Sequence, residues 1–123
     1  MALSRLILSF ALLSSFTACF EKEVGCDDYA AASVVVTVLD EAGAPVEGAA
    51  LDFDVVEADS HGPCDEVGAG EYVCGYEISG AMTISVVAEG FEPQELEVEV
   101  SLTDDECHVE TISETVTLVA AAA

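Results

Sequence analysis

Positive charge is almost absent from this sequence. Its 123 residues include two basic side chains, Arg5 and Lys22, against 25 Asp and Glu, which gives a formal net charge of −23 at pH 7. A basic patch is the electrostatic footprint of nucleic-acid binding, so the composition excludes nucleic acid as a partner. The same charge repels anionic lipid head groups, so any attachment to a membrane must come from something other than charge.

Catalytic groups are equally scarce. No serine lies in a Gly-x-Ser-x-Gly nucleophile elbow, and no arginine follows Arg5 to stabilise a developing oxyanion. The two histidines, His61 and His108, are the only general bases of their type. We expect His61 to lie in a solvated loop and His108 at the start of a strand near the surface. The sequence therefore predicts a protein that is not an enzyme and has no cofactor.

No hydrophobic run is long enough to cross a bilayer as a helix, which needs roughly 20 apolar residues. The N-terminal run follows the single charge of Arg5, covers residues 6–16 and leads into the small residues Thr17 and Ala18. A positive start, a short apolar run and a small-residue end are typical of a secretory signal peptide. We expect residues 1–18 to be removed, which leaves one lysine against 25 acidic residues, a formal charge of −24.

The stretch "FTAC", residues 16–19, resembles the lipobox of bacterial lipoproteins, with Phe16 in place of the usual leucine. The resemblance implies that Cys19 begins the mature protein and carries a diacylglycerol on its sulfur. Two or three acyl chains, at ~0.8 kcal/mol per buried methylene, would form a durable anchor. The resemblance also implies a bacterial cell envelope, and Phe20 in place of an aspartate favours the outer membrane. The alternative is ordinary signal cleavage before a free or paired cysteine.

The remaining chain suits one domain. Residues 19–32 are polar and then small, without a clear period, which predicts a lipidated tether. Residues 33–119 carry the strand patterns and form the predicted domain. The last four residues, 120–123, are alanines and are expected to form a frayed tail.

Short alternating or β-branched runs predict six or seven strands. The run at residues 34–39 is apolar on both faces, which favours a strand at the centre of a sheet. Strands are expected at residues 34–39, 49–56, 70–77, 82–88 and 94–100, with one or two more within 107–119 and a long loop at 57–69. No segment after residue 18 has the 3.6-residue hydrophobic period of a helix. The sequence therefore predicts an all-β, antiparallel sandwich whose solvent-exposed faces carry Asp and Glu.

Residues 34–55 resemble the start of carboxypeptidase regulatory-like domains. The shared pattern is an alternating strand, the motif "GAPVEGA" at residues 43–49, and a second alternating strand. The glycine–aromatic step at residues 90–91 also fits, so the resemblance covers roughly residues 33–118. It implies a transthyretin-like or immunoglobulin-like β-sandwich, and it brings no catalytic residues with it.

The five cysteines are an odd number for an oxidising compartment, where cysteines pair. If Cys19 carries lipid, four remain, and these allow three connectivities. The short spacing of Cys64 and Cys74 favours a local bridge, which leaves Cys26 to pair with Cys107. The chain-entropy model gives about 3 kcal/mol for the short loop and about 4.5 kcal/mol for the long one. The other two connectivities remain open at this point.

Metal binding is the rival use of the thiols and carboxylates. A zinc site needs compact pairs of ligands, and the Cys and His spacings here do not supply them. Calcium needs six to eight oxygens, and no acidic run has the EF-hand spacing. We therefore expect solvated carboxylates and no metal. The best calcium candidates, if a neighbouring loop adds carboxylates, are Asp104, Asp105 and Glu106.

These patterns together predict a non-catalytic, lipid-anchored envelope protein that presents an acidic β-sandwich as a structural, adhesion or protein-binding module. Expected partners are the membrane, through the lipid, and another envelope protein or a glycan. Loops on rigid sandwiches commonly bind ligands, and the candidates in the loop at residues 57–69 are Asp59, His61, Asp65 and Glu66.

The alternative is an accessory protein that binds a small ligand, a carbohydrate or Ca²⁺ through its loops. Carbohydrate binding predicts clustered exposed aromatic side chains, and tryptophan is absent. The candidates are Tyr29, Tyr72 and Tyr76, and we expect Tyr72 and Tyr76 to face the core.

Overall fold

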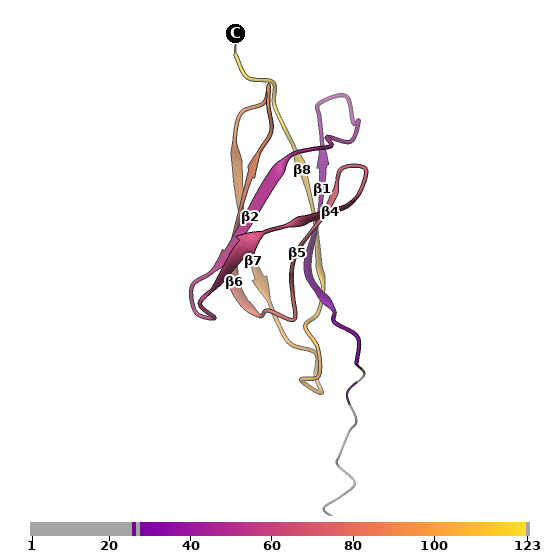
Figure 1. Cartoon of the computed structure of the whole chain (residues 1–123), viewed down its shortest axis with the longest axis vertical. Coiled ribbons are helices and arrows are strands. Elements are labelled where there is room, and N and C mark those ends of the chain that lie inside the picture. The colour runs from indigo at the N-terminus through magenta and orange to yellow at the C-terminus, as the bar shows by residue number, and fades with distance from the viewer. Residues whose placement is uncertain (1–25, 27, 123) are drawn as a thin grey trace, which may run out of the picture.

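The computed structural model describes Cys26 and residues 28–122, so the predicted signal peptide, Cys19 and most of the tether lie outside the described residues. Two four-stranded sheets pack face to face (Figure 1). None of the described residues forms an α-helix, and hence none of them belongs to a helix long and apolar enough to cross a membrane. The predicted all-β sandwich class is confirmed at this level.

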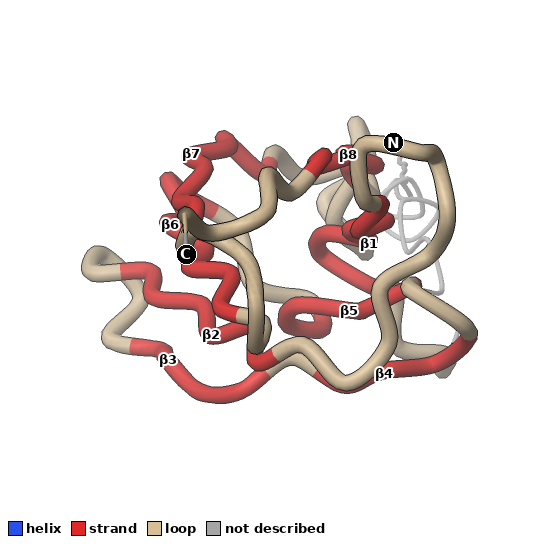
Figure 2. Tube along the Cα trace, turned by 90° about the horizontal axis from the view of Figure 1, so that it is seen from above, coloured by secondary structure: helices blue, strands red, loops and turns tan. Residues whose placement is uncertain are grey.

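Each sheet is named after its strand that comes first in the sequence. The β1 sheet has the strand order β4-β5-β1-β8 and the β2 sheet has the order β3-β2-β6-β7 (Figure 2). Their strands are β1 (Ala32–Leu39), β2 (Ala50–Val55), β3 (Ser60–Pro63), β4 (Asp65–Gly68), β5 (Glu71–Tyr76), β6 (Gly80–Val87), β7 (Gln94–Val100) and β8 (Ile112–Thr117).

Strand β1 lies between β5 and β8, at the centre of its sheet, as its apolar run predicts. Val34, Val36 and Val38 point into the core and are fully buried, whereas Val35 and Thr37 lie half-buried on the other face. β-branched side chains suit such a position because they pack well on a pleated surface.

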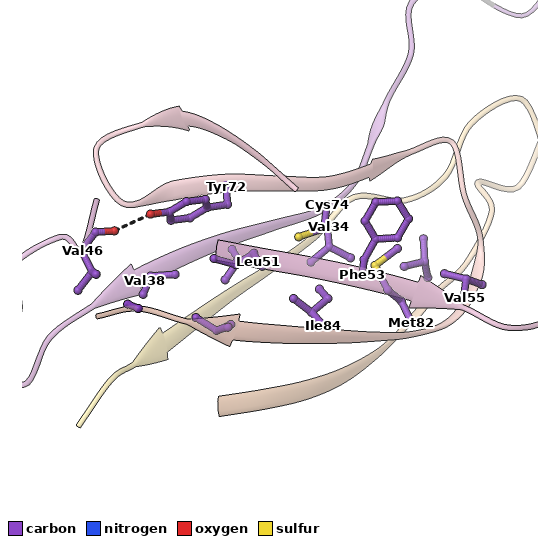
Figure 3. Packing of buried hydrophobic residues seen from close by; sticks show 14 of the residues in the cluster. Val34, Val38, Val46, Leu51, Phe53, Val55, Tyr72, Cys74, Met82 and Ile84 are labelled. Atoms are coloured by element: carbon purple, nitrogen blue, oxygen red, sulfur yellow. Dashed lines mark hydrogen bonds between the residues drawn. The ribbon is translucent and has the colours of Figure 1, made fainter. Parts of the chain in front are cut away.

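The core fills the space between the two sheets (Figure 3). Alternation in β2 places Leu51, Phe53 and Val55 inward, while Asp52 and Asp54 face solvent. The inward residues of β6, Met82, Ile84 and Val86, are buried against them. Burial of each such side chain stabilises the fold by about 1.5–3 kcal/mol, and this burial is the main favourable contribution to folding.

The expectation of a purely antiparallel sandwich is wrong at one strand pair. Strand β8 pairs with β1 in parallel, in a register that runs from Val34 opposite Ile112 to Leu39 opposite Thr117. The reason lies in the connections. Strand β7 runs toward the end of the sandwich where β1 begins, and residues 101–111 cross to the other sheet at that end, so β8 starts beside the start of β1 (Figure 1).

The expectation of one long loop at residues 57–69 is also wrong. A tight turn at residues 56–59 leads into β3, and β4 follows after a single residue, Cys64. Strand β3 is an edge of the β2 sheet and β4 is an edge of the β1 sheet. The chain therefore closes one side of the sandwich by passing directly from one sheet to the other at Cys64.

Smaller differences concern the ends of the domain. Strand β1 begins at Ala32, inside the predicted tether, and residues 107–111 form no strand. The expected frayed tail is anchored at its first residues, since Ala120 forms a β-bridge with Phe91 and the Ala121 N–H donates to Gly90 O (2.9 Å). The C-terminal residues and the described residues of the tether lie at opposite ends of the sandwich (Figure 1).

The turn that joins β1 to β2 is fixed from inside the core. The phenol of Tyr72 donates to Val46 O (2.7 Å) and accepts from Ala49 N–H (3.0 Å), and its ring is buried. Gly70 closes the same end: its carbonyl accepts from Val38 N–H (2.8 Å). A Cβ on Gly70 would lie 2.7 Å from Pro45 Cβ and 2.9 Å from Val38 O, and φ is +70°.

We expect Gly70→Ala to destabilise the fold by about 3 kcal/mol, because the methyl group collides with backbone in addition to the strain of a positive φ. Gly43→Ala is the matched control: its φ is +85°, but a Cβ there meets nothing within 4 Å. This control should cost about 1 kcal/mol. Urea unfolding with the disulfides intact measures both, and equal losses would contradict the close approach at Gly70.

Candidate functional site

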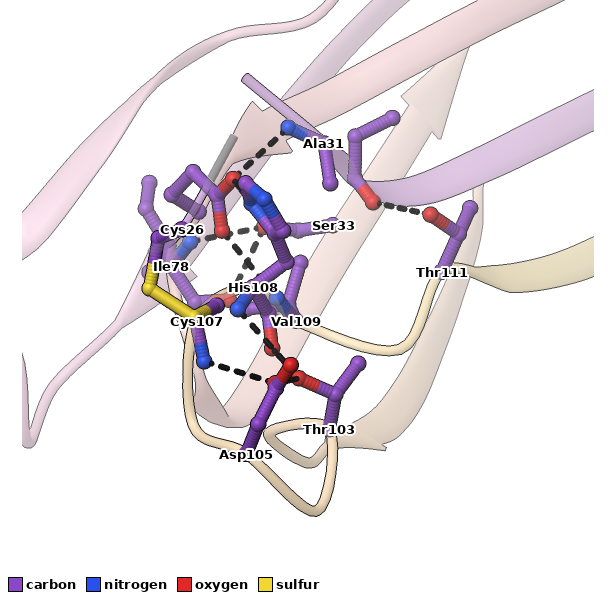
Figure 4. A network of polar contacts seen from close by, with 12 residues as sticks. Cys26, Ala31, Ser33, Ile78, Thr103, Asp105, Cys107, His108, Val109 and Thr111 are labelled. Carbon is purple, nitrogen blue, oxygen red and sulfur yellow. Dashed lines mark hydrogen bonds and ion pairs between the residues drawn. A yellow bond between two sulfur atoms is a disulfide. The ribbon is translucent and has the colours of Figure 1, made fainter. Parts of the chain in front are cut away.

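The described part of the predicted tether is fixed to one end of the sandwich by a disulfide. Cys26 pairs with Cys107 across 81 positions of sequence, with Cα atoms 5.3 Å apart, and Cys64 pairs with Cys74, with Cα atoms 4.3 Å apart. Both predicted bridges are thus present. The Cys26–Cys107 bridge joins the tether to the turn at residues 101–111, between β7 and β8 (Figure 4).

Glu77 is the centre of the polar contacts at this end, which we call the tether clasp: Tyr29, Ala31, Glu77, His108 and Val109. The Glu77 carboxylate accepts from the N–H groups of Ala31 (2.8 Å) and Val109 (3.0 Å) and contacts His108 Nδ1. Glu77 also has φ of +55°, an uncommon value for a residue other than glycine. One side chain therefore holds the tether, the β5–β6 turn and the β7–β8 turn together.

The expectation that His108 begins a strand near the surface is wrong. His108 lies in the turn before β8, and its side chain is 11% exposed. Its ring stacks on Tyr29, with the centroids 4.2 Å apart, and pairs with Glu77, while Nε2 is buried without a partner among the described residues. The turn brings His108 under the tether, a long-range contact that no local pattern reveals.

The clasp sets the ionisation of Glu77. The hydrogen bond from Ala31 N–H, and next the contact with His108, hold the pKa of Glu77 below its ordinary value. A buried hydroxyl supports the same region, since Ser33 Oγ donates to Ile78 O and accepts from Ile78 N–H, each at 2.9 Å. The carboxylate is thus stabilised in its charged form by fixed backbone donors.

The calcium candidates do not form a metal site. Asp105 accepts from Thr103 Oγ1 (2.7 Å) and from Cys107 N–H (3.0 Å), contacts that lower the pKa of Asp105 and fold its own turn. Asp104 and Glu106 are exposed beside it. Across Cys26 and residues 28–122, no three His, Cys, Asp or Glu side chains gather in a way that could hold an ion.

The four candidate binding residues of the expected loop do not converge on one site. Asp59 lies in the β2–β3 turn, His61 lies on β3 opposite Asp54, and Asp65 and Glu66 lie on β4 in the other sheet. The carboxylate of Glu66 accepts from Gly48 N–H (3.1 Å), so it supports the β1–β2 turn. These residues are separated because the chain changes sheets at Cys64.

A shallow depression of about 260 Å³ lies instead on the outer face of the β2 sheet. Asp52 and Asp54 come from β2, and the cross-strand register places Ser85 opposite Asp52 and Glu95 opposite Ser85. The alternation of these strands predicts outward carboxylates. It does not predict that β6 lies between β2 and β7, which is what gathers them on one face.

The tyrosines do not form an aromatic cleft. Tyr72 is 1% exposed, as expected, whereas Tyr76 is 45% exposed, contrary to the expectation that it faces the core. Tyr76 is the last residue of β5, paired with Ala32 at the start of β1, where the core ends. Tyr29 is exposed on one side and stacks on His108 with the other. This arrangement gives no support to carbohydrate binding.

We expect Glu77→Gln to lower the unfolding midpoint at pH 7 but not at low pH. A folded-state pKa below the unfolded value contributes stability that is present above the unfolded pKa and is lost as the pH falls through the folded pKa. The difference between the variant and the wild type should therefore be constant down to about pH 5 and shrink below about pH 4.

The control for this experiment is Glu97→Gln, which removes an exposed carboxylate on β7 that accepts no hydrogen bond from another described residue. It should not lower the midpoint at pH 7. A Glu77→Gln difference that stays equal, or grows, on acidification would contradict the role assigned to the Glu77 carboxylate. Urea titrations at each pH, monitored by circular dichroism, give the midpoints.

Comparisons with known proteins do not assign this chain to a family. No model of a known protein family matches it, and no curated protein is significantly similar to it. The carboxypeptidase regulatory-like domain and the lipobox therefore remain predictions drawn from the residues quoted above.

Proposed function

We propose that this protein is a non-catalytic, lipid-anchored module of a bacterial cell envelope that presents an acidic β-sandwich to an envelope partner.

 The single observation that carries the proposal is the way the tether is held. The predicted lipid site, Cys19, lies seven residues before Cys26, and Cys26 is covalently joined to the end of the domain through Cys107. An anchor at Cys19 would therefore pull on a disulfide and on the tether clasp, not on a loosely attached strand end.

The geometry of the ends supports the same function. The described residues of the tether lie at the end that carries the tether clasp, and the C-terminal residues lie at the opposite end (Figure 1). The β1–β2 turn lies at that far end too, where the buried phenol of Tyr72 and the carboxylate of Asp40 hold it. A protein anchored at Cys19 would present this far end, and both sheet faces, away from the lipid.

The proposed role is binding or structural support, not catalysis. Charge gives the reason: the described residues include no lysine or arginine, so they offer no side-chain cation other than histidine to a developing negative charge. The pair of His108 and Glu77 is used to hold the tether, and neither residue lines the depression on the β2 sheet. The partner that suits such a surface is an envelope protein, and nucleic acid does not suit it.

The anchor is tested by the intact mass of the full-length gene product expressed in a bacterial host and extracted from its membranes. We expect a chain that begins at Cys19, carries added acyl mass and lies four hydrogens below the reduced polypeptide, because two disulfides are formed. Reduction and alkylation of the same sample should then modify four thiols and leave the lipid in place.

Cys19→Ala is the matched control, since it removes the predicted lipid site and leaves Cys26–Cys107 and Cys64–Cys74 unchanged. This variant should lose the acyl mass and keep both disulfides. A wild-type chain that begins elsewhere and carries no lipid would refute the lipid anchor. Four free thiols in the extracted protein would refute the two disulfides.

A further inference from the structure

Three of the four sheet edges carry features that discourage another strand from pairing with them. Strand β3 is four residues long and includes Gly62 and Pro63, and β4 is equally short, with a register shift between Glu66 and Gly68. Strand β7 presents three glutamates on its outer face. Short strands, proline, bulges and charge are the usual means by which proteins protect sheet edges.

The fourth edge, β8, has only one of these features, a single charged side chain. Its six residues pair with β1 in an unbroken parallel register and include no proline or glycine and one charged side chain, Glu114. The Leu118 N–H donates to Leu39 O (2.8 Å), so in an alternating strand the backbone groups of even-numbered residues point toward β1. Those of Ser113, Thr115 and Thr117 point to the opposite side, where they pair with none of the described residues.

The inner side of β8 faces a half-buried apolar seam along the open side of the sandwich. Ile112 and Val116 of β8, and Leu96 and Val98 of β7, are partly buried against the core. Between the two apolar residues of β8 lies Glu114, whose half-buried side chain makes no hydrogen bond or ion pair with another described residue. The inward side chains of β8 are therefore apolar, negative and apolar in turn, at every second residue.

We propose that the free edge of β8 binds an extended segment of another protein by β-strand addition. The segment has an apolar, a basic and an apolar residue at every second position, so that its main chain pairs with Ser113, Thr115 and Thr117 while its basic side chain meets Glu114. Main-chain bonds supply the affinity in this mode and alternate side chains supply the specificity. The net charge of −23 attracts a basic segment and repels a second copy of this chain.

This inference deepens the binding role proposed above, and it rests on that role and not on the lipid. An unlipidated chain that binds such a segment would refute the anchor and leave the inference intact. A lipidated chain that does not bind the segment would refute the inference and leave the anchor intact.

The probe is the capped peptide TVTKTVT, which reads the same in both directions and so can add in parallel or antiparallel. It is titrated into the ¹⁵N-labelled full-length chain in detergent micelles while backbone amide resonances are followed. We expect saturable shifts centred on Ser113, Thr115 and Thr117, together with slower hydrogen exchange at those amides. The matched peptide with glutamate in place of the central lysine should bind at least about fivefold more weakly, because like charges then meet at Glu114.

Two further peptides separate main-chain pairing from side-chain contact. One is N-methylated at the threonines and the other at the valines and the lysine, so each loses the donors of one edge. Antiparallel addition uses the threonine donors and parallel addition uses the valine and lysine donors, so each peptide should keep only the direction that its remaining donors allow. A peptide N-methylated at every residue should not bind, and binding by that peptide, or shifts that lie away from β8, would overturn the inference.

Variants of the protein test the same edge from its own side. Thr115→Pro removes an outward N–H and should weaken binding about tenfold, whereas Thr115→Val keeps that N–H and should bind as the wild type does. Glu114→Gln should weaken binding about two- to fivefold and leave the fold unchanged. Protection of the Ser113, Thr115 and Thr117 amides without peptide would overturn the inference, because it would show an edge that is already covered. The cover would be this chain if concentration has no effect on the protection, and a second copy if it does.

Discussion

Carboxylates that accept hydrogen bonds from backbone N–H groups are the interaction on which the turns and junctions of this fold depend. With no lysine or arginine among the described residues, an acidic side chain has no strong cation to pair with, yet each loop must satisfy its backbone donors. Bonds from N–H groups to ionised acceptors are shorter and stronger than neutral ones, and they hold four separate turns or junctions here. The acceptors are Asp40, Glu66, Glu77 and Asp105.

The strands that could be predicted from the sequence are those with a buried side-chain period. Residues 94–100 alternate and form β7 with the expected bounds, and the apolar run at 34–39 marks the centre of a sheet. Strands β3 and β4 could not be predicted, because "SHGP" and "DEVG" lack apolar alternation. They form because β2 and β5 offer unpaired backbone groups and because Cys64, bonded to Cys74, holds the crossing chain against the core.

The candidate site likewise has a part that could be predicted from the sequence and a part that could not. Both disulfides are those that cysteine spacing favours once Cys19 is set aside, although spacing alone leaves two other connectivities open. The tether clasp could not be predicted, because Glu77, His108 and Tyr29 meet only after three separate segments reach the same end of the sandwich. One signal was available: a histidine directly after a bridged cysteine is held at a fixed place in the fold, and Cys107 fixes His108 in this way.

The acidic composition acts differently on the two sheets. Outward side chains of the β2 sheet include five carboxylates on β2 and β7, whereas the outward residues along β8 are serine and threonine. Copies of this chain that met through their β2 sheets would bring unscreened like charges together, and a Debye length of about 8 Å at physiological salt does not remove repulsion at contact. Main-chain hydrogen bonding at β8, by contrast, needs no charge on this chain. A protein of one sign can therefore remain monomeric among its own copies and still offer one strand edge to a partner of the opposite sign.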